Sequence, residues 1–309
     1  PYPNFIAPIH KGKLRATMYC IEHRWFLGTF GQRTRATMNF GDLRGIHHYV
    51  PQYREQLFVV AIDGAVCACE NFANVLLDLA VLHSLNVRLA IVHGAGEQIR
   101  NLATERDLAI SCADGTGVTD AATLELSIDA ISRLTNKLMQ DLTAIGLRAA
   151  TANAVRANPA GVIGGVDQEH TGKVDRVDCE SLNSFLGEGM IPVIPPLGFD
   201  GKGGTLRINS DAAAVAIAES LGASKILFLT AGETGINTAT NRQLSVAEAP
   251  TIASGRGDYS RRLASMFGFA ARACETGIDR VHLLDGSRND ALLAELFSNE
   301  GVGIMVYQD

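Results

Sequence analysis

Residues 57–64 form an unbroken apolar run, LFVVAIDG, that ends in an Asp-Gly turn. Residues 87–96, VRLAIVHGAG, contain a second apolar run and a second glycine turn. Between them, residues 71–85 place apolar side chains at helical spacing. Strand, helix and strand in this order predict parallel strands joined by right-handed crossovers. The ligand crevice of such a sheet lies at the carboxyl ends of its strands, where both glycine turns fall.

The rest of the chain continues this alternation, so the sequence predicts an α/β fold. Residues 149–179 contain several glycines and predict a β-rich excursion, and residues 231–244 predict a loop or hairpin. Further strands are expected at 191–194, 225–230, 280–284 and 304–307. Further helices are expected at 41–55, 98–108, 120–147, 181–186, 211–221, 260–276 and 289–297.

The composition excludes several classes of protein. Of the 309 residues, 47% are hydrophobic and 19% are charged, which excludes intrinsic disorder. The net charge of −6 argues against a nucleic-acid binder, and no apolar run approaches the ~18 residues of a membrane helix. Six scattered cysteines are typical of a reducing compartment, so we expect a cytoplasmic protein. Segment 1–40 is basic and irregular, and we interpret it as a tag, a read-through or an arm.

Four motifs in the right order resemble the amino-acid kinase family: FVVAIDG at 58–64, HGAG at 93–96, DGTGVTD at 114–120 and NSD at 209–211. The resemblance covers residues 41–309. It is closest to the kinase-like domain of N-acetylglutamate synthase, and next to N-acetylglutamate kinase. It implies a three-layer α/β/α sandwich with a largely parallel central sheet, as in carbamate kinase.

The same resemblance implies a vestigial kinase site. Phosphoryl transfer needs cations around the transferred group. Ala61 stands where the family's kinases carry a lysine, and Asp63 replaces a glycine. Ser265 falls at the second lysine in an ungapped match, although Arg261 and Arg262 are close by. Asp211 is retained, either from the kinases' arrangement or as the N-cap of the helix that follows.

The substrate pocket implied by the family also departs from the kinase pattern. Ala95 adds a methyl group where a substrate carboxylate would approach. Gly117 replaces an arginine that grips this carboxylate, and Arg207 replaces an asparagine. A degenerate pocket is the simplest interpretation. Its expected residues are Gly64, Gly94, Ala95, Gly96, Gly117, Arg207 and Asn209.

A second site is implied near the C-terminal strand, because arginine-inhibited members of the family bind arginine there. Glu295 could accept the guanidinium fork, and the backbone at 301–303 could contact the ligand's α-groups. Ile304 replaces a threonine of the family. The helix expected at 41–55 resembles the element that interlaces subunits into hexamers. The matching residues are Tyr49, His282, Glu295, Gly301 and Gly303.

Three functions therefore stay open. The leading hypothesis is a non-phosphorylating, kinase-like domain of an N-acetylglutamate synthase-like protein of arginine biosynthesis that binds L-arginine as regulator. We expect no acetyltransferase domain in this chain, so a separate acetyltransferase is a possible partner. The first alternative is an active kinase that uses ATP and Mg²⁺ through Arg207, Arg261 or Arg262. The second is a structural subunit that builds homo-oligomers. We predict no metal site and no other cofactor.

Overall fold

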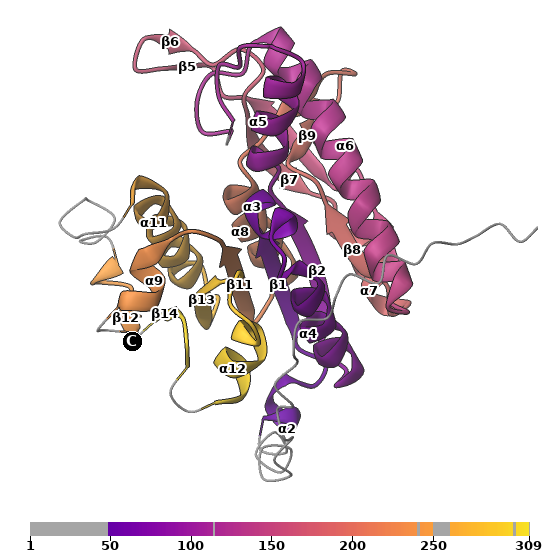
Figure 1. Ribbon diagram of the computed structural model, residues 1–309, viewed down its shortest axis with the longest axis vertical. Coiled ribbons are helices and arrows are strands. Elements are labelled where there is room, and N and C mark those ends of the chain that lie inside the picture. Colours follow the sequence, from indigo (N-terminus) through magenta and orange to yellow (C-terminus); the bar gives the residue numbers. More distant parts are fainter. Residues whose placement is uncertain (1–48, 114, 240–241, 250–259, 299–300, 309) are drawn as a thin grey trace, which may run out of the picture. The chain divides into compact units, whose positions relative to one another are not determined.

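The computed structural model describes residues 49–113, 115–239, 242–249, 260–298 and 301–308 (Figure 1). Contacts divide the chain into two units, Pro1–Phe40 and Gly41–Asp309, and every described residue belongs to the second. The basic segment 1–40 and residues 41–48 of the predicted N-terminal helix lie outside the described residues. No helix among the described residues has the length and apolar character that a membrane crossing requires.

The centre of the second unit is an eight-stranded sheet, and its largely parallel arrangement confirms the predicted fold class. Six neighbouring strands are parallel, whereas β14 is antiparallel to β13, and β12 is parallel to β14. The order across the sheet is β12 (Gln243–Ser245), β14 (Ile304–Tyr307), β13 (Arg280–Asp285), β11 (Lys225–Thr230), β1 (Leu57–Ile62), β2 (Arg88–His93), β8 (Ile191–Ile194) and β3 (Ala149–Thr151).

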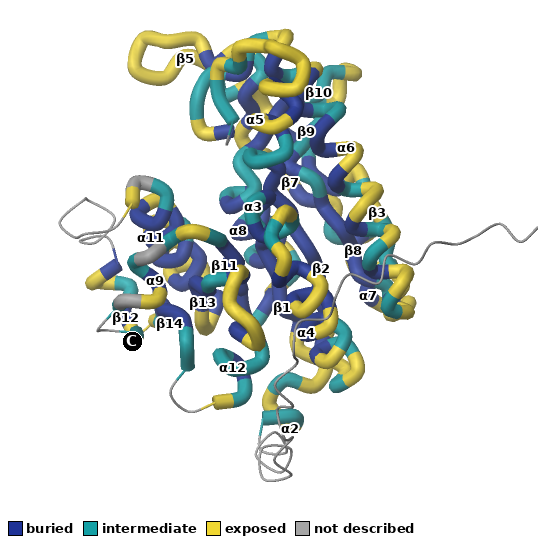
Figure 2. The backbone as a smooth tube through the Cα atoms, viewed as in Figure 1, coloured by how far each residue is buried: buried dark blue, intermediate teal, exposed yellow. Residues whose placement is uncertain are grey.

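Helices cover both faces of this sheet, which makes the three layers that the family resemblance implied. All six residues of β1 are buried: Val59 and Ala61 join one apolar cluster, and Phe58, Val60 and Ile62 join the other. In Figure 2 the central strands of this sheet, among them β1, β2 and β11, are mostly dark blue, and many exposed residues lie on the outer helices and turns. One layer holds α7 (Cys179–Gly187), α8 (Ser210–Leu221) and α11 (Arg261–Glu275). The other holds α3 (Gly64–Ala68), α4 (Phe72–Ser84), α5 (Gly96–Glu105), α6 (Ala121–Ala144) and α12 (Ala291–Phe297).

A smaller sheet confirms the β-rich excursion predicted for 149–179. Two of its strands lie further along the chain and were not predicted, because prolines before them and glycines between them indicate a loop. A separate hairpin projects at the top of Figure 1. The smaller sheet runs β10 (Thr205–Arg207), β9 (Leu197–Phe199), β4 (Val155–Pro159) and β7 (Gly172–Val177), and the hairpin pairs β5 (Val162–Ile163) with β6 (Val166–Asp167).

Two other segments differ from prediction. In the described part of 41–55, the helix is only α2 (Val50–Tyr53). Pro51 lies in the first turn of α2, where no amide hydrogen bond is lost. The segment expected as a loop or hairpin contains α9 (Thr234–Thr238) before β12.

Candidate functional site

The two glycine turns meet at the carboxyl ends of β1 and β2, as parallel strands require. A Cβ placed on Gly94 would lie 3.4 Å from the backbone nitrogen of Gly64 and 3.3 Å from Oγ of Ser210. Beside them lies a small cavity of about 110 Å³, here called the glycine-turn cleft. It is lined by Asp63, Gly94, Ala95, Gly96, Arg100, Pro196, Arg207, Ile208, Ser210 and Arg262.

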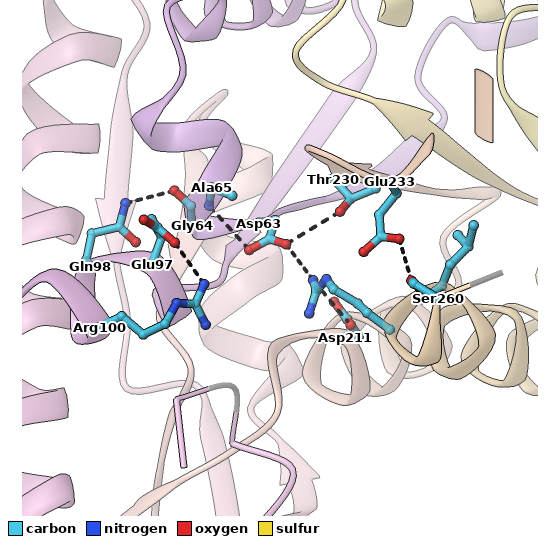
Figure 3. Close-up of polar contacts among 12 residues, drawn as sticks. Asp63, Gly64, Ala65, Glu97, Gln98, Arg100, Asp211, Thr230, Glu233 and Ser260 are labelled. Carbon is cyan, nitrogen blue, oxygen red and sulfur yellow. Dashed lines mark hydrogen bonds and ion pairs between the residues drawn. The ribbon is translucent and has the colours of Figure 1, made fainter. Parts of the chain in front are cut away.

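An ion-pair network lies at the glycine-turn cleft. Nη2 of Arg262, on α11, lies 2.8 Å from Asp63 and 3.9 Å from Asp211. Asp63 also accepts hydrogen bonds from the amide of Ala65 (3.4 Å) and the hydroxyl of Thr230 (3.5 Å). Figure 3 shows Asp63 at the centre of these contacts. The charge of Arg262 is therefore already paired with two carboxylates of the chain itself.

The other predicted members of the vestigial kinase site are placed differently. Ala61 is 4% exposed and packs in an apolar cluster. Ser265 is exposed and does not line the cleft, whereas Arg262, one helical turn earlier, does. The N-cap of α8 is Asn209, whose side chain accepts a 2.9 Å hydrogen bond from the amide of Ala212. The interpretation of Asp211 as an N-cap is therefore wrong.

The predicted substrate pocket is only partly assembled. Gly94, Ala95, Gly96 and Arg207 line the cleft, whereas Gly64, Gly117 and Asn209 do not. Arg207 is 2% exposed. Its guanidinium donates to the carbonyl oxygens of Cys112, at 2.6 Å, and Ala113. These bonds hold the loop before α6 in place, and they turn the guanidinium of Arg207 toward the backbone of that loop.

Gly117 lies in this same loop. Its amide donates to Sγ of Cys112 at 3.3 Å, and its carbonyl accepts a 2.7 Å hydrogen bond from Thr171. Both polar groups of its backbone are thus used within the protein. His93 is fully buried behind the glycine turn, where Nε2 lies 2.9 Å from Oγ1 of Thr135. Burial lowers the pKa of His93 to about 4, so the ring is neutral.

The residues predicted for the second site surround a single cavity of about 250 Å³, here called the Glu295 cavity. It lies on one face of β12, β14 and β13, against α2 and α12. Its aromatic wall is tightly packed, because the rings of Tyr49 and Tyr53 are 6.1 Å apart and stacked. The lining residues are Tyr49, Tyr53, Arg242, Gln243, Arg280, His282, Glu295, Leu296, Ser298, Gly301, Gly303 and Met305.

Glu295 is the hub of this cavity. Oε1 lies 2.7 Å from Nδ1 of His282, and Oε2 accepts the amides of Val302 (2.7 Å) and Gly303 (2.8 Å). A Cβ on Gly303 would lie 2.5 Å from the carbonyl oxygen of Leu283, so only glycine allows this approach. The amides at 302 and 303 were expected to contact a ligand, but they bind the carboxylate of the chain itself.

The charge states of this pair follow from its surroundings. Burial is the largest influence on the pKa of His282 and lowers it, so the ring is neutral. Burial by itself would raise the pKa of Glu295. The hydrogen bond from His282 and the two amides outweigh it and lower that pKa. An ionised carboxylate only accepts, so Nδ1 of His282 donates and Nε2 is an acceptor. Nε2 is buried and makes no hydrogen bond with the described residues.

Cationic side chains also surround the Glu295 cavity, and the sequence analysis missed them. Arg242 donates from Nη1 to the carbonyl oxygens of Val302 and Gly303. Lys225 is 7% exposed, with Nζ 5.5 Å from the ring centre of Tyr53, and burial lowers its pKa to about 8. Nothing in the local sequence distinguishes these cations, because β11 and β12 meet α2 only in the folded chain.

Comparison with known proteins places the chain. Residues 56–284 match the family model described as "Amino acid kinase family". An amino-acid acetyltransferase of Pseudomonas fluorescens is 37% identical over 279 residues, covering 86% of this chain and 64% of the relative. One of Pseudomonas putida is 36% identical over 280 residues, with the same coverage. The chain thus spans about 64% of the length of these relatives.

Solved structures agree. N-acetylglutamate synthase from Neisseria gonorrhoeae, complexed with coenzyme A and N-acetyl-glutamate, superposes with a TM-score of 0.80 at 27% identity, over 87% of this chain and 63% of that chain. The complex with coenzyme A and L-arginine gives 0.78 at 27% identity, over 87% and 65%. Carbamate kinase from Giardia lamblia, at 11% identity, gives 0.60 over 82% and 99% and shares the fold. The chain belongs to the amino-acid kinase family, and within it resembles the kinase-like region of the amino-acid acetyltransferases.

Proposed function

We propose that this chain is a non-phosphorylating, kinase-like regulatory domain that binds L-arginine in the Glu295 cavity. One observation carries the proposal: the buried, unpaired acceptor Nε2 of His282 lines a cavity that also holds an ionised carboxylate. An unsatisfied buried acceptor costs free energy, and a ligand that donates a hydrogen bond removes this cost.

The chemistry of the cavity suits a guanidinium group. A guanidinium carries five N–H donors in a planar fork and no acceptor. It could donate to Nε2 of His282 and to the remaining lone pair of Oε1 of Glu295. The rings of Tyr49 and Tyr53 offer faces on which a planar cation stacks. The Neisseria relative that binds L-arginine supports the choice of ligand.

The glycine-turn cleft supports the absence of phosphoryl transfer. Asp63 projects a carboxylate where the transferred phosphate would need cations, and it already pairs with Arg262. Arg207, one of the three arginines that the kinase alternative could use, points its guanidinium at backbone carbonyls. The side chain of Arg261, which the kinase alternative also named, lies outside the part of the chain that the structure describes.

Calorimetric titration with L-arginine and with MgATP tests the proposal. We expect saturable binding of arginine and no binding of MgATP. Glu295→Gln should weaken arginine binding at least about tenfold, because it removes the charge that receives the guanidinium. Glu188→Gln, which changes an exposed carboxylate at the end of α7, is the matched control. Turnover of ATP on N-acetylglutamate, or saturable ATP binding, would contradict the non-phosphorylating assignment.

The role in a larger assembly is part of the same proposal. We propose that arginine binding regulates an N-acetylglutamate synthase activity, supplied either by a further domain or by a separate acetyltransferase, within a homo-oligomer. The similarity to amino-acid acetyltransferases supports this role. Light scattering of the chain with and without arginine measures its molar mass in solution. A monomer in both conditions would contradict the proposed homo-oligomer.

A further inference from the structure

The Glu295 cavity has a surplus of positive charge near its ligand-facing surface. Glu295 receives three hydrogen bonds from the chain, and His282 is neutral. Two guanidinium groups, Arg242 and Arg280, line the same cavity. A ligand that brought only a cation would face this surplus without compensation. A ligand that also carries an anionic group would balance it.

Arg280 is the better placed of the two arginines. Arg242 already donates to the carbonyl oxygens of Val302 and Gly303, so its guanidinium is held at the start of β14. Arg280 makes no hydrogen bond or ion pair with the residues that the structure describes. Its neighbour in the sequence, Asp279, lines a second cavity beside Arg280 and not the Glu295 cavity.

Arg280 and His282 are spaced along β13 so that each could contact one end of a bound amino acid. Arg280 and His282 lie two residues apart on the same strand, so their side chains project from the same face about 6.6 Å apart. Cross-strand partners of this face are Tyr307 and Met305. A second cavity of about 560 Å³ shares Gln243, Arg280 and Met305 with the first, so the wall continues outward past Arg280.

We infer that Arg280 binds the α-carboxylate of the ligand and thereby makes the Glu295 cavity selective for a free α-amino acid over an amine. This inference rests on the proposed function. In this arrangement the guanidinium of the ligand contacts His282 and Glu295. The α-carboxylate end of the ligand lies over β13, near Arg280. The carboxylate then forms a charge-assisted, two-pronged contact with Arg280, the geometry for which a guanidinium is suited.

Calorimetry with three probes tests the inference: L-arginine, agmatine, which lacks the carboxylate, and L-arginine methyl ester, which lacks its charge. The unaltered chain should bind arginine about tenfold or more tightly than either analogue. Arg280→Gln should bring the three affinities within about twofold of one another, and agmatine should bind at least as tightly as to the unaltered chain, because a repelling charge is removed. Arg280→Lys should restore part of the difference, because it returns the charge without the fork.

Two further variants separate selectivity from general damage. Arg242→Gln should weaken all three probes alike, since it loosens the segment that Glu295 holds. Arg133→Gln, on the exposed face of α6, should change none of them. Equal affinity of the unaltered chain for arginine and agmatine, or an equal loss of both in Arg280→Gln, would overturn the inference and leave arginine binding intact. No binding of arginine at all would overturn the proposed function and, with it, this inference.

Discussion

Asp78 is a carboxylate on α4 that the fold makes difficult to ionise. It is 6% exposed, and burial, followed by the nearby charge of Asp290, raises its pKa to about 7. It accepts a hydrogen bond from the backbone of Leu293, in the first turn of α12, which limits this rise. The same helix carries Glu295 in the opposite situation, with its pKa lowered. One short helix is thus held by two carboxylates of contrasting character.

The pKa of Asp78 predicts how the free energy of unfolding depends on pH. The unfolded carboxyl titrates near pH ~3.9, so between pH ~4 and about 7 the native state binds more protons than the unfolded state. This group's contribution to stability is present below pH ~4 and is lost as the pH rises to about 7. Asp78→Asn should therefore stabilise the protein by about 1–2 kcal/mol at pH 8 and by little at pH ~4.

Urea unfolding at a series of pH values checks this result. Asp107→Asn is the control, because it changes an exposed aspartate whose positive φ suits asparagine equally well. A pH profile of Asp78→Asn that runs parallel to that of the unaltered chain would show that Asp78 does not titrate in this range.

The contacts that individual side chains make in the candidate site were the hardest feature to predict from the sequence. Arg207 was assigned to substrate by position, but its partners are carbonyl oxygens 94 and 95 residues away in the chain. Ser265 was assigned by an ungapped match, but it is exposed and does not line the cleft, whereas Arg262, one turn of α11 earlier, does. Spacing in a sequence fixes the face of a helix, but the register between two helices is set by packing.

At the scale of elements, the long apolar segments were predictable and the short polar ones were not. β1, β2, β8, β11, β13 and β14 are runs of four to six residues that are mostly buried, and burial on both faces leaves a strong signal. β9, β10 and α3 have three to five residues, too few to show a period. The helix predicted at 120–147 is confirmed as α6, whose apolar stripe runs over 24 residues.

Two glycines, one before β14 and one inside α11, should respond in opposite ways to alanine. In Gly303→Ala the new methyl would meet the Leu283 carbonyl at 2.5 Å and Cδ2 of Leu284 at 2.3 Å. β14 must then move away from β13, and we expect a loss of at least about 2 kcal/mol of unfolding free energy. Gly268→Ala lies inside α11 with nothing within 4 Å, so it should gain about 0.5–1 kcal/mol.

Chemical denaturation of both variants measures the contrast. A neutral Gly303→Ala would mean that the start of β14 has room to relax, and it would weaken the account of how Glu295 is held.

At the scale of the whole molecule, the Glu295 cavity joins parts of the chain that are far apart. Tyr49 and Gly303 are separated by more than 250 residues in the sequence and line the same wall. No periodicity or spacing predicts this meeting, and only the family resemblance put the five residues together. The parallel sheet itself was predictable, because each strand-turn-helix unit is local.

A ligand in this cavity should stabilise the folded chain as a whole. Binding to the native state alone adds about 2.7 kcal/mol when the ligand is at a hundred times its Kd. For a domain of this size, that corresponds to a rise in Tm of about 5–10 °C. We expect this rise with L-arginine, measured by scanning calorimetry, and none with MgATP. A rise with MgATP and none with arginine would reverse the roles of the two sites.

The antiparallel direction of β14 has a mechanical consequence. Its first residue follows the segment gripped by Glu295, and its last, Tyr307, pairs with Arg280 at the other end of β13. β14 is hydrogen-bonded on both sides, to β12 and to β13, and sliding it along either neighbour would break these ladders. The strand therefore ties the segment held by Glu295 rigidly to the end of β13 that carries Arg280.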